Sequence, residues 1–392
     1  MARKIKICAV TSTRADWGLL LPLLRAIRDD GHFELKLAVT GQHLDPSAGA
    51  TNRAIRADGF KIDAKVDMKL TNDTPTAVNA ALGRAVAGFG QALAKMKPDL
   101  LFVLGDRYEI LGAVTAATIA RVPVVHNCGG DLTEGAVDEG IRHAISKLSH
   151  IHFVTNAASR RRVCQMGENP RHVVTVGSSG IELLRTMRLM TRKEFFTSVD
   201  LDPRQKAVIV TFHPETLAPG ATVAHCREML AALERLPPDI GLLFCGTNAD
   251  MEGRDIDALV KRFVGRRDNA VFHASLGSRR YLSALKHCDA VIGNSSSGIY
   301  EAPSLATPTV NIGDRQKGRL RAASVIDVIP DRRAIHKAIV RALAMDCRGV
   351  KNPYGNGKAS AKMTVALKKI MGEIQWDTTR LLRKPFFPAG ER

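Results

Sequence analysis

The chain has 392 residues, of which 45% are hydrophobic and 24% charged, the balance of a globular protein with a large core. That length suits two domains of roughly 150–200 residues each. No apolar run approaches the roughly 20 residues that a membrane span needs. The N-terminal MARKIKICAV has no signal-peptide pattern, so we expect a cytoplasmic protein.

The formal net charge of +18 raises the question of a nucleic-acid partner. The basic residues are dispersed in small clusters, and aromatic residues make up only 5% of the chain, which leaves few surfaces on which bases could stack. We therefore expect no nucleic-acid partner and keep nucleic-acid binding as the noncatalytic alternative. An anionic small-molecule substrate explains the sign of the charge equally well.

The seven cysteines are widely scattered and include no CxxC pair. This spacing predicts neither a disulfide framework nor a metal site, so we expect reduced core cysteines and no metal.

Short apolar, β-branched runs alternate with longer helical patterns, which is typical of parallel sheets covered by helices on both faces. In chain order the first set of strands is KIKICAVT, LKLAVTG, LLFVLGD, VPVVHN, IHFVTN and VVTVG, and the second set is AVIVTFH, IGLLFCG, AVFHA, AVIGNSS and TPTVNIG. The segment between them, 177–203, is helical and then polar. The sequence predicts two Rossmann-like domains at 1–180 and 181–365, and a last amphipathic helix at 366–392 that packs back on the first domain.

Ligands of such sheets bind beyond the carboxyl ends of the strands. Small polar and charged residues follow nearly every predicted strand. They are Thr13-Arg14, Gly41-Gln42-His43, Gly105-Asp106-Arg107, the run from His126 to Asp131, His213-Pro214-Glu215, Thr247-Asn248 and the run from Gly293 to Gly298. This regularity predicts one cleft between two facing domains.

Two motifs of the first half place charge directly after a strand. In TSTRADWGLL, Arg14 suits a diphosphate, with a solvated surface arginine as the alternative. In LGDRYEIL, Asp106 is either a catalytic base or the cap of the next helix.

The stretch GGDLTEGAVDEGIRHAISKLSH brings Asp131, Asp138 and two glutamates together, and its apolar spacing predicts a helix from about Ala136. Several neighbouring carboxylates can hold different protonation states, which proton transfer at a weakly acidic carbon requires. The alternative for Asp138 is a helix-surface salt bridge with Arg142, four residues on.

In the second half, His213 follows AVIVTF, where it is either structural or a catalytic or phosphate-contacting group. GNSSSGIYEAPSLATP sets glycine and serine before a helical stretch, which favours a phosphate cradle over an ordinary N-cap. Glu301, one turn further on, could accept hydrogen bonds from ribose hydroxyls. No GxxxxGK[ST] and no GxGxxG occurs, so neither a P-loop nor a dinucleotide fingerprint is present.

Together these residues resemble the UDP-N-acetylglucosamine 2-epimerase family, most closely its hydrolysing branch, which makes N-acetylmannosamine for sialic-acid-type sugars. The resemblance rests, in order, on TSTRADWGLL, TGQHL, GDRYEIL, GGDLTEGAVDEGIRHAISKLSH, HPET, TNAD, GNSSSGIYE and PTVNIGDRQKGR, over about residues 7–320. It implies a GT-B architecture, no bound cofactor, a nucleotide-sugar substrate and a homodimer.

The resemblance also implies roles for individual residues. Arg14, Arg107, His213, Asn248, Ser295, Ser296, Glu301 and Arg315 would hold the nucleotide diphosphate, Gln42 and His43 would lie nearer the sugar, and Asp106, Asp131 and Asp138 would supply acid–base chemistry, with His213 also a catalytic candidate. The implied reaction removes the C2 proton, expels the nucleoside diphosphate to give a glycal, and then adds water. Donors around the departing diphosphate would stabilise the charge that develops there.

One departure from the family pattern concerns the residues after the fourth strand of the first half. Where relatives commonly carry a carboxylate, this chain has Cys128, and we expect Asp131 to substitute for it. Three alternatives remain: the same chemistry on a GDP-linked or 2,4-diacetamido sugar, a nonhydrolysing 2-epimerase, and a GT-B glycosyltransferase.

Overall fold

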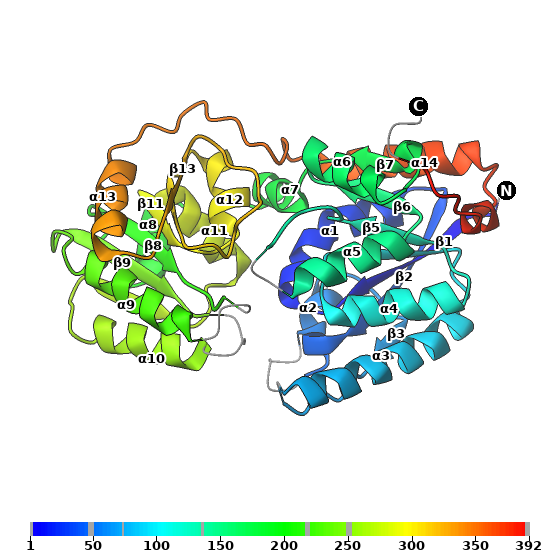
Figure 1. The fold of residues 1–392 in the computed structure, drawn as a ribbon, viewed down its shortest axis with the longest axis horizontal. Coiled ribbons are helices and arrows are strands. Elements are labelled where there is room, and N and C mark those ends of the chain that lie inside the picture. The colour runs from blue at the N-terminus through cyan, green and yellow to red at the C-terminus, as the bar shows by residue number, and fades with distance from the viewer. Residues whose placement is uncertain are drawn as a thin grey trace. The chain divides into compact units, whose positions relative to one another are not determined.

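The structure, a computed structural model of the chain, describes residues 3–45, 51–72, 74–134, 137–215, 220–247 and 253–388. It contains two compact units, each built around its own parallel sheet (Figure 1). The first unit comprises Met1–Asp131, Asp138–Leu183 and Tyr354–Arg392, and the second comprises Leu132–Val137 and Leu184–Pro353. The sequence predicts limits at residues 180 and 365, whereas the chain enters the second unit at Leu184 and returns to the first at Tyr354.

Among the described residues of the first unit, seven parallel strands pair in the order β3-β2-β1-β4-β5-β6-β7. They are β1 (Ile5–Thr11), β2 (Phe33–Thr40), β3 (Ala64–Val66), β4 (Leu100–Leu104), β5 (Val124–Asn127), β6 (Ile151–Val154) and β7 (Val173–Thr175). The helices are α1 (Arg14–Asp29), α2 (Asn52–Ala57), α3 (Pro75–Met96), α4 (Tyr108–Ile119), α5 (Asp138–Leu148), α6 (Ala157–Gln165) and α14 (Ala359–Glu373), and α7 (Ser179–Thr186) leads into the second unit. Short 3-10 turns occupy η1 (Gly41–His43), η2 (Pro170–His172) and η4 (Thr378–Leu382).

In the described part of the second unit, six parallel strands pair in the order β10-β9-β8-β11-β12-β13. They are β8 (Lys206–Thr211), β9 (Ile240–Cys245), β10 (Ala270–His273), β11 (Ala290–Gly293), β12 (Thr309–Ile312) and β13 (Val325–Val328). The helices are α8 (Arg192–Ser198), α9 (Ala221–Leu233), α10 (Gly253–Val264), α11 (Gly277–His287), α12 (Ser297–Tyr300) and α13 (Arg332–Leu343), with a 3-10 turn η3 (Ala302–Leu305).

The continuous apolar runs of the strands follow from burial on both faces of each sheet. Successive side chains of a strand point to opposite faces. In β1, Ile7 and Ala9 belong to one core cluster, whereas Cys8 and Val10 belong to another on the opposite face. Because both faces are covered, every central position of the strand is apolar.

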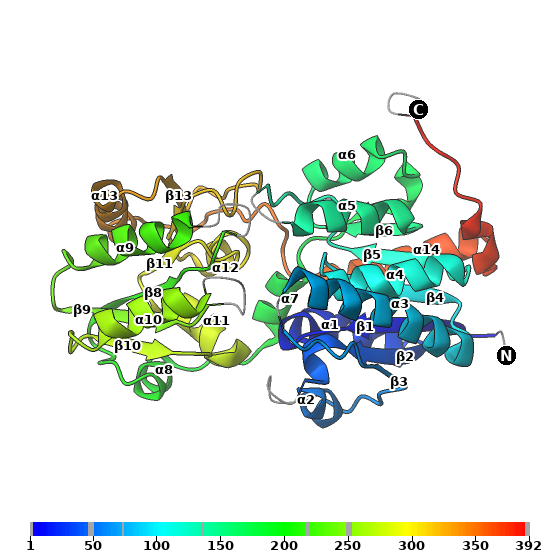
Figure 2. The ribbon, with the colours of Figure 1, turned by 60° about the horizontal axis from the view of Figure 1, so that its bottom comes forward.

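Helix α14, which lies near the C-terminal end of the sequence, packs into the core of the first unit. Its apolar residues, among them Met363 and Leu367, are fully buried in the cluster that includes residues of α1 and β1. Figures 1 and 2 show this orange-red helix among the blue and green elements of the first unit. The core of the first unit therefore contains residues from both the N-terminal and the C-terminal parts of the sequence.

Two strands, β3 and β13, are absent from the strands predicted by sequence. Each lies at an edge of its sheet and has one strand neighbour. Ala64 and Lys65 of β3 are not buried, and neither is any residue of β13. An edge strand needs no continuous apolar run, so the pattern that predicts the central strands misses these two.

In the part of the chain that the structure describes, no helix combines the length and the apolar character needed to cross a membrane.

The packing of α14 predicts a position-dependent cost of truncation. Leu367→Ala should lower the free energy of unfolding of the first unit by about 2–5 kcal/mol, because it leaves a cavity in a closed core. Val365→Ala, two residues earlier but 65% exposed, should change it by no more than about 0.5 kcal/mol. Urea titrations followed by circular dichroism would measure both, and equal losses would contradict this packing.

Candidate active site

The two sheets share one topological feature that locates candidate sites. Strand order reverses between β1 and β4 in the first unit and between β8 and β11 in the second. Ligands of open parallel sheets bind beyond the carboxyl ends of the strands at such switch points. The residues after these four strands are therefore candidates for binding a ligand.

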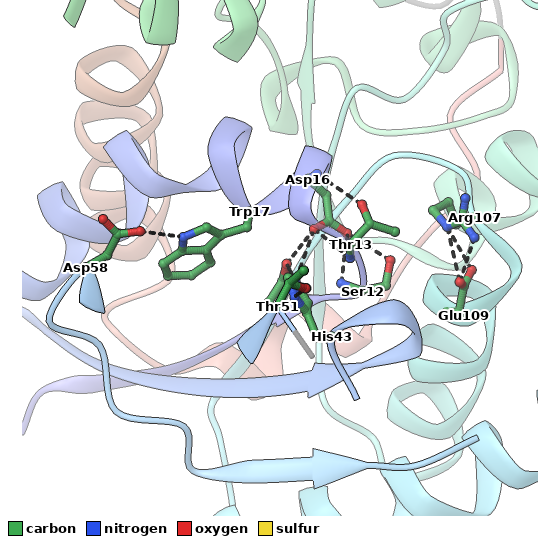
Figure 3. A network of polar contacts seen from close by, with 10 residues as sticks. Ser12, Thr13, Asp16, Trp17, His43, Thr51, Asp58, Arg107 and Glu109 are labelled. Atoms are coloured by element: carbon green, nitrogen blue, oxygen red, sulfur yellow. Dashed lines mark hydrogen bonds and ion pairs between the residues drawn. The ribbon is translucent and has the colours of Figure 1, made fainter. Parts of the chain in front are cut away.

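A buried polar network fixes the turn between β1 and α1 (Figure 3). The Asp16 carboxylate accepts hydrogen bonds from the Thr11 hydroxyl at 2.5 Å and from the backbone N–H and the hydroxyl of Ser12, both at 2.8 Å. Thr13 and Asp16 also form a capping box at the start of α1. Burial opposes ionisation of Asp16, but hydrogen bonds from His43 and Thr11 lower its pKa.

His43 is part of this network and is only 1% exposed. Its Nε2 lies 2.9 Å from the Thr11 hydroxyl and its Nδ1 lies 2.7 Å from the Thr51 hydroxyl, so both ring nitrogens have partners in the protein. Gln42 and Arg14, in contrast, are exposed at the ends of β2 and β1. A contact between His43 and a sugar stays a prediction.

The centre of the carboxylate cluster is the buried guanidinium of Arg142 on α5. Arg142 is 3% exposed, pairs with the Asp106 carboxylate after β4, and donates to the Asp131 carbonyl at 2.7 Å. A weaker contact at 3.4 Å joins it to Glu139. Sequence spacing left open a surface salt bridge between Arg142 and Asp138, but Arg142 is buried and pairs with Asp106.

Asp138, at the first position of α5, has an unusual electrostatic environment. Burial, together with the negative charge of Asp106, raises the pKa of the Asp138 carboxyl. Asp106 is paired with the Arg142 guanidinium, and its negative charge disfavours a second negative charge on Asp138. A carboxyl group with a raised pKa holds a proton more readily than an ordinary one, which favours a role in proton transfer.

The Asp131 carboxylate is 6% exposed and accepts hydrogen bonds from the hydroxyls of Thr155 and Ser159, at 2.6 and 2.5 Å. Three residues earlier, Cys128 adopts a left-handed backbone with φ of 70°. Gly130 also has a positive φ, and a Cβ there would lie 2.5 Å from the Ser159 carbonyl oxygen. The loop is thus tightly constrained, and the two hydroxyls orient the Asp131 carboxylate.

Two other residues of the predicted set have structural partners. Arg107 forms a forked ion pair with Glu109, which is 1% exposed, with a shortest distance of 2.8 Å. His126 is fully buried between the Gly105 carbonyl at 2.8 Å and the Ser146 hydroxyl at 3.1 Å. Burial lowers the pKa of His126 to about 3, so the imidazole is neutral at physiological pH.

In the second unit, two reciprocal hydrogen bonds join the residues that follow β8 and β11 at the switch point. The Asn294 side chain accepts from the His213 backbone N–H at 2.7 Å and donates to the His213 carbonyl at 2.8 Å. Burial, and then the nearby charge of Arg315, lower the pKa of the His213 imidazole to about 3. His213 can therefore bind a phosphate or sugar oxygen as a neutral hydrogen-bonding group rather than as a cation.

The serines after β11 lie beside a very short helix. Ser295 and Ser297 are joined through their hydroxyls at 3.0 Å, and Ser297 is also bonded to the Tyr281 hydroxyl at 2.5 Å. Ser296 precedes α12 without making a side-chain capping bond. Because α12 has only four residues, its dipole is small, and the hydroxyls are the main donors that this turn offers.

Glu301 and Arg315 flank these serines. Burial raises the pKa of the half-buried Glu301 carboxyl to about 8, against the opposing effects of a backbone hydrogen bond and of the charge of Arg319. Arg315 donates to the carbonyls of Pro214 at 3.3 Å and Asn294 at 3.2 Å. Glu301 follows β11 in the sequence. Arg315 follows β12, and its two carbonyl partners follow β8 and β11.

Asn248, also expected at the nucleotide, lies outside the described residues. Among the described residues, no group of three or more His, Cys, Asp or Glu side chains is arranged to hold a metal ion.

Several residues that build these arrangements were not identified as site candidates from sequence. They are Arg142, Thr155, Ser159, Tyr281, Asn294, Gln316 and Arg319. Asn294 carries a detectable signal, because it directly follows a buried strand, and Gln316 and Arg319 fall within the motif PTVNIGDRQKGR. Thr155 carries the same signal, because it directly follows the buried strand β6, whereas Ser159 carries none, since its partner Asp131 lies 28 positions away.

The raised pKa of Glu301 predicts a pH dependence of stability. The folded protein keeps this carboxyl protonated up to about pH 8, whereas the unfolded chain releases the proton near the ordinary pKa of 4.5. Between these values the unfolded state binds fewer protons, so the free energy of unfolding falls as pH rises. Glu301→Gln has no such group, so its stability relative to wild type should grow from about pH 5 to about pH 8.

Urea midpoints at several pH values would measure this difference. The matched control is Glu228→Gln, because hydrogen bonds from Arg332 lower the pKa of Glu228 to about 2 and its difference from wild type should stay constant over the same interval. A constant difference for Glu301→Gln as well would contradict the prediction.

Comparison with known proteins places the chain in a family. The UDP-N-acetylglucosamine 2-epimerase family model matches residues 25–368. A relative from Campylobacter jejuni, named GDP/UDP-N,N'-diacetylbacillosamine 2-epimerase (hydrolyzing), is 38% identical over 83% of this chain and 84% of its own length. The polysialic acid biosynthesis protein P7 of Escherichia coli is 36% identical over 85% of each chain.

The fold agrees with these matches. The crystal structure of UDP-GlcNAc 2-epimerase from Neisseria meningitidis bound to UDP-GlcNAc superimposes with a TM-score of 0.81, covering 93% of this chain and all of that one, at 18% identity. This likeness confirms the predicted fold class of two Rossmann-like units of the GT-B type. On the family match and the two relatives, the chain belongs to the UDP-N-acetylglucosamine 2-epimerase family.

Proposed function

We propose that the protein is a hydrolysing 2-epimerase of a nucleotide-linked 2-acetamido sugar, converting UDP-N-acetylglucosamine to N-acetylmannosamine and UDP for sialic-acid-type sugar synthesis. The observation that carries the proposal is the carboxyl of Asp138, whose pKa is raised by burial and by Asp106. A side chain with this property suits proton transfer at the weakly acidic C2 carbon. The hydrolysing names of similar proteins add support.

The proposed reaction balances in two stages. In the first, a carboxylate takes the C2 proton, the C1–C2 double bond forms, and the C1–O bond breaks so that its electron pair leaves with UDP. In the second, a proton is delivered to C2 on the opposite face while water adds its oxygen to C1 and gives up a proton. Free sugar with inverted C2 configuration and UDP result.

In the first unit, Asp138 is the proposed proton-transfer group. Asp106, paired with Arg142, is the second carboxylate and raises the proton affinity of Asp138. Asp131, oriented by Thr155 and Ser159, is the third and takes the place of the carboxylate missing at Cys128.

The proposed nucleotide ligands are hydroxyls, guanidinium groups and neutral polar groups. Such groups can stabilise the negative charge that develops on the departing diphosphate. They are Arg14, Arg107, His213, Asn248, Ser295, Ser296, Glu301 and Arg315, with Gln42 and His43 nearer the sugar. A formal net charge of +18 would speed the encounter with an anionic nucleotide sugar. A homodimer is part of the same proposal.

A second candidate substrate is a UDP- or GDP-linked N,N'-diacetylbacillosamine. The specific observation in its favour is the name of the Campylobacter jejuni relative, which is 38% identical to this chain over 325 residues. Parallel assays with UDP-N-acetylglucosamine and the diacetamido nucleotide sugars, measuring nucleoside diphosphate release by chromatography, would rank the two. A higher kcat/KM with the diacetamido sugar would replace the leading substrate and keep the reaction.

Asp138→Asn and Asp106→Asn should each lower kcat by about 10²–10⁴-fold, the usual contribution of a positioned acid or base. Affinity for UDP, measured by calorimetry, should stay near that of wild type, because the nucleotide ligands are elsewhere. Asp131→Asn should lower turnover in the same way. Asp346→Asn, in an exposed pair with Arg348, is the matched control and should behave as wild type. Wild-type turnover in Asp138→Asn would contradict the assignment.

A further inference from the structure

An arginine of the second unit, Arg319, contacts the segment directly after Asp131. Leu132–Val137 belongs to the second unit although it links Asp131 to Asp138, both of which lie in the first. Arg319 donates from Nε to the Leu132 carbonyl at 3.1 Å and from Nη2 to the Thr133 hydroxyl at 3.0 Å. Two donors of one planar guanidinium therefore engage consecutive residues of this segment.

The local chain is shaped for this contact. Gly318 adopts φ of 84°, and a Cβ there would lie only 2.8 Å from the Leu132 Cβ. Only glycine therefore permits the close approach without strain. Thr133 is 7% exposed, so its contact with Arg319 is shielded from water.

Arg319 is itself fixed by its neighbours in the second unit. Its Nη1 donates to the Gln316 side-chain oxygen at 2.5 Å, and its guanidinium carbon lies 5.2 Å from the centre of the Tyr300 ring. Gln316 in turn donates to the Asn294 carbonyl at 2.8 Å. Gln316 therefore joins Arg319 to Asn294, whose side chain is hydrogen-bonded to the His213 backbone.

A continuous path of hydrogen bonds thus runs from His213 through Asn294, Gln316 and Arg319 to Leu132, the residue bonded covalently to Asp131. His213, at the start of this path, is a proposed nucleotide ligand, and Leu132, at its end, adjoins the proposed acid–base group Asp131. Arg319 has no proposed role in binding or proton transfer.

We infer that Arg319 is a positioning residue that holds Leu132 and Thr133 and thereby orients Asp131, the residue covalently bonded to Leu132. The inference rests on the proposed function for its catalytic consequence. The anchoring itself rests on the contacts alone and can be tested without turnover.

The first test is amide hydrogen exchange of Arg319→Lys. A lysine keeps the charge but cannot span both acceptors, so exchange in peptides covering 132–134 should quicken by about tenfold or more, with little change in β8 and β11. Arg332→Lys, another arginine with a forked partner in the same unit, is the matched control and should leave 132–134 protected. Unchanged exchange in Arg319→Lys would overturn the anchoring.

The second test is kinetic. A misplacement of about 1 Å can cost about 10²-fold, so Arg319→Lys should lower kcat by roughly 10- to 100-fold. Its Kd for UDP should stay within about twofold of wild type, the split expected when only catalytic geometry is lost. Thr133→Val should lower kcat in the same direction, whereas Thr133→Ser, which keeps the acceptor hydroxyl, should restore it.

Because the two side chains act through one contact, the double variant Arg319→Lys/Thr133→Val should lose less than the product of the single losses. Strictly multiplicative losses, or a fall in UDP affinity as large as the fall in kcat, would overturn the inference. If wild type turns over no nucleotide sugar, the proposed function fails, while the exchange measurement still decides whether Arg319 anchors the segment.

Discussion

The buried ion pair between Arg142 and Asp106 is the interaction on which the arrangement of the carboxylates in the first unit depends. Removing an arginine from water costs several kcal/mol, and that cost is offset only when its donors find good partners. Here the partners are the Asp106 carboxylate after β4 and the Asp131 carbonyl after β5. One side chain of α5 therefore fixes the ends of two neighbouring strands and places Asp138, the first residue of the same helix, beside Asp106.

The two units place their candidate groups at equivalent positions of the fold, but the groups differ in their chemistry. Each has its candidate groups beyond a switch point, where a parallel sheet leaves space for a ligand. In the first unit these groups are mainly carboxylates, and burial together with the charge of Asp106 raises the pKa of one of them, Asp138. In the second they are hydroxyls, an amide, an arginine and the His213 imidazole, which burial keeps neutral. Such a division suits a reaction that moves protons at a sugar carbon and releases a charged nucleoside diphosphate.

Sequence predicts the central strands and the order of candidate residues well, because burial on both sheet faces leaves a continuous apolar run followed by a polar turn. It fails where stability comes from contacts distant in sequence. The edge strands β3 and β13 lack such runs, and the buried Arg142 pairs with Asp106, 36 positions away, as well as with Glu139 at helical spacing. The contact of Arg319 with Thr133 spans 186 positions and leaves no local pattern. The predicted start of α5 near Ala136 falls outside the described residues, and the described helix begins at Asp138.

Proton NMR of the protein with UDP-N-acetylglucosamine in deuterated water tests the central claim most directly, because it reports on C2 and on the C1–O bond together. The proposed chemistry predicts free N-acetylmannosamine that carries deuterium at C2, appearing in step with UDP. Deuterium at C2 of a sugar that stays linked to its nucleotide would contradict hydrolysis, and release of a free sugar that keeps its original C2 proton would contradict proton transfer at that carbon.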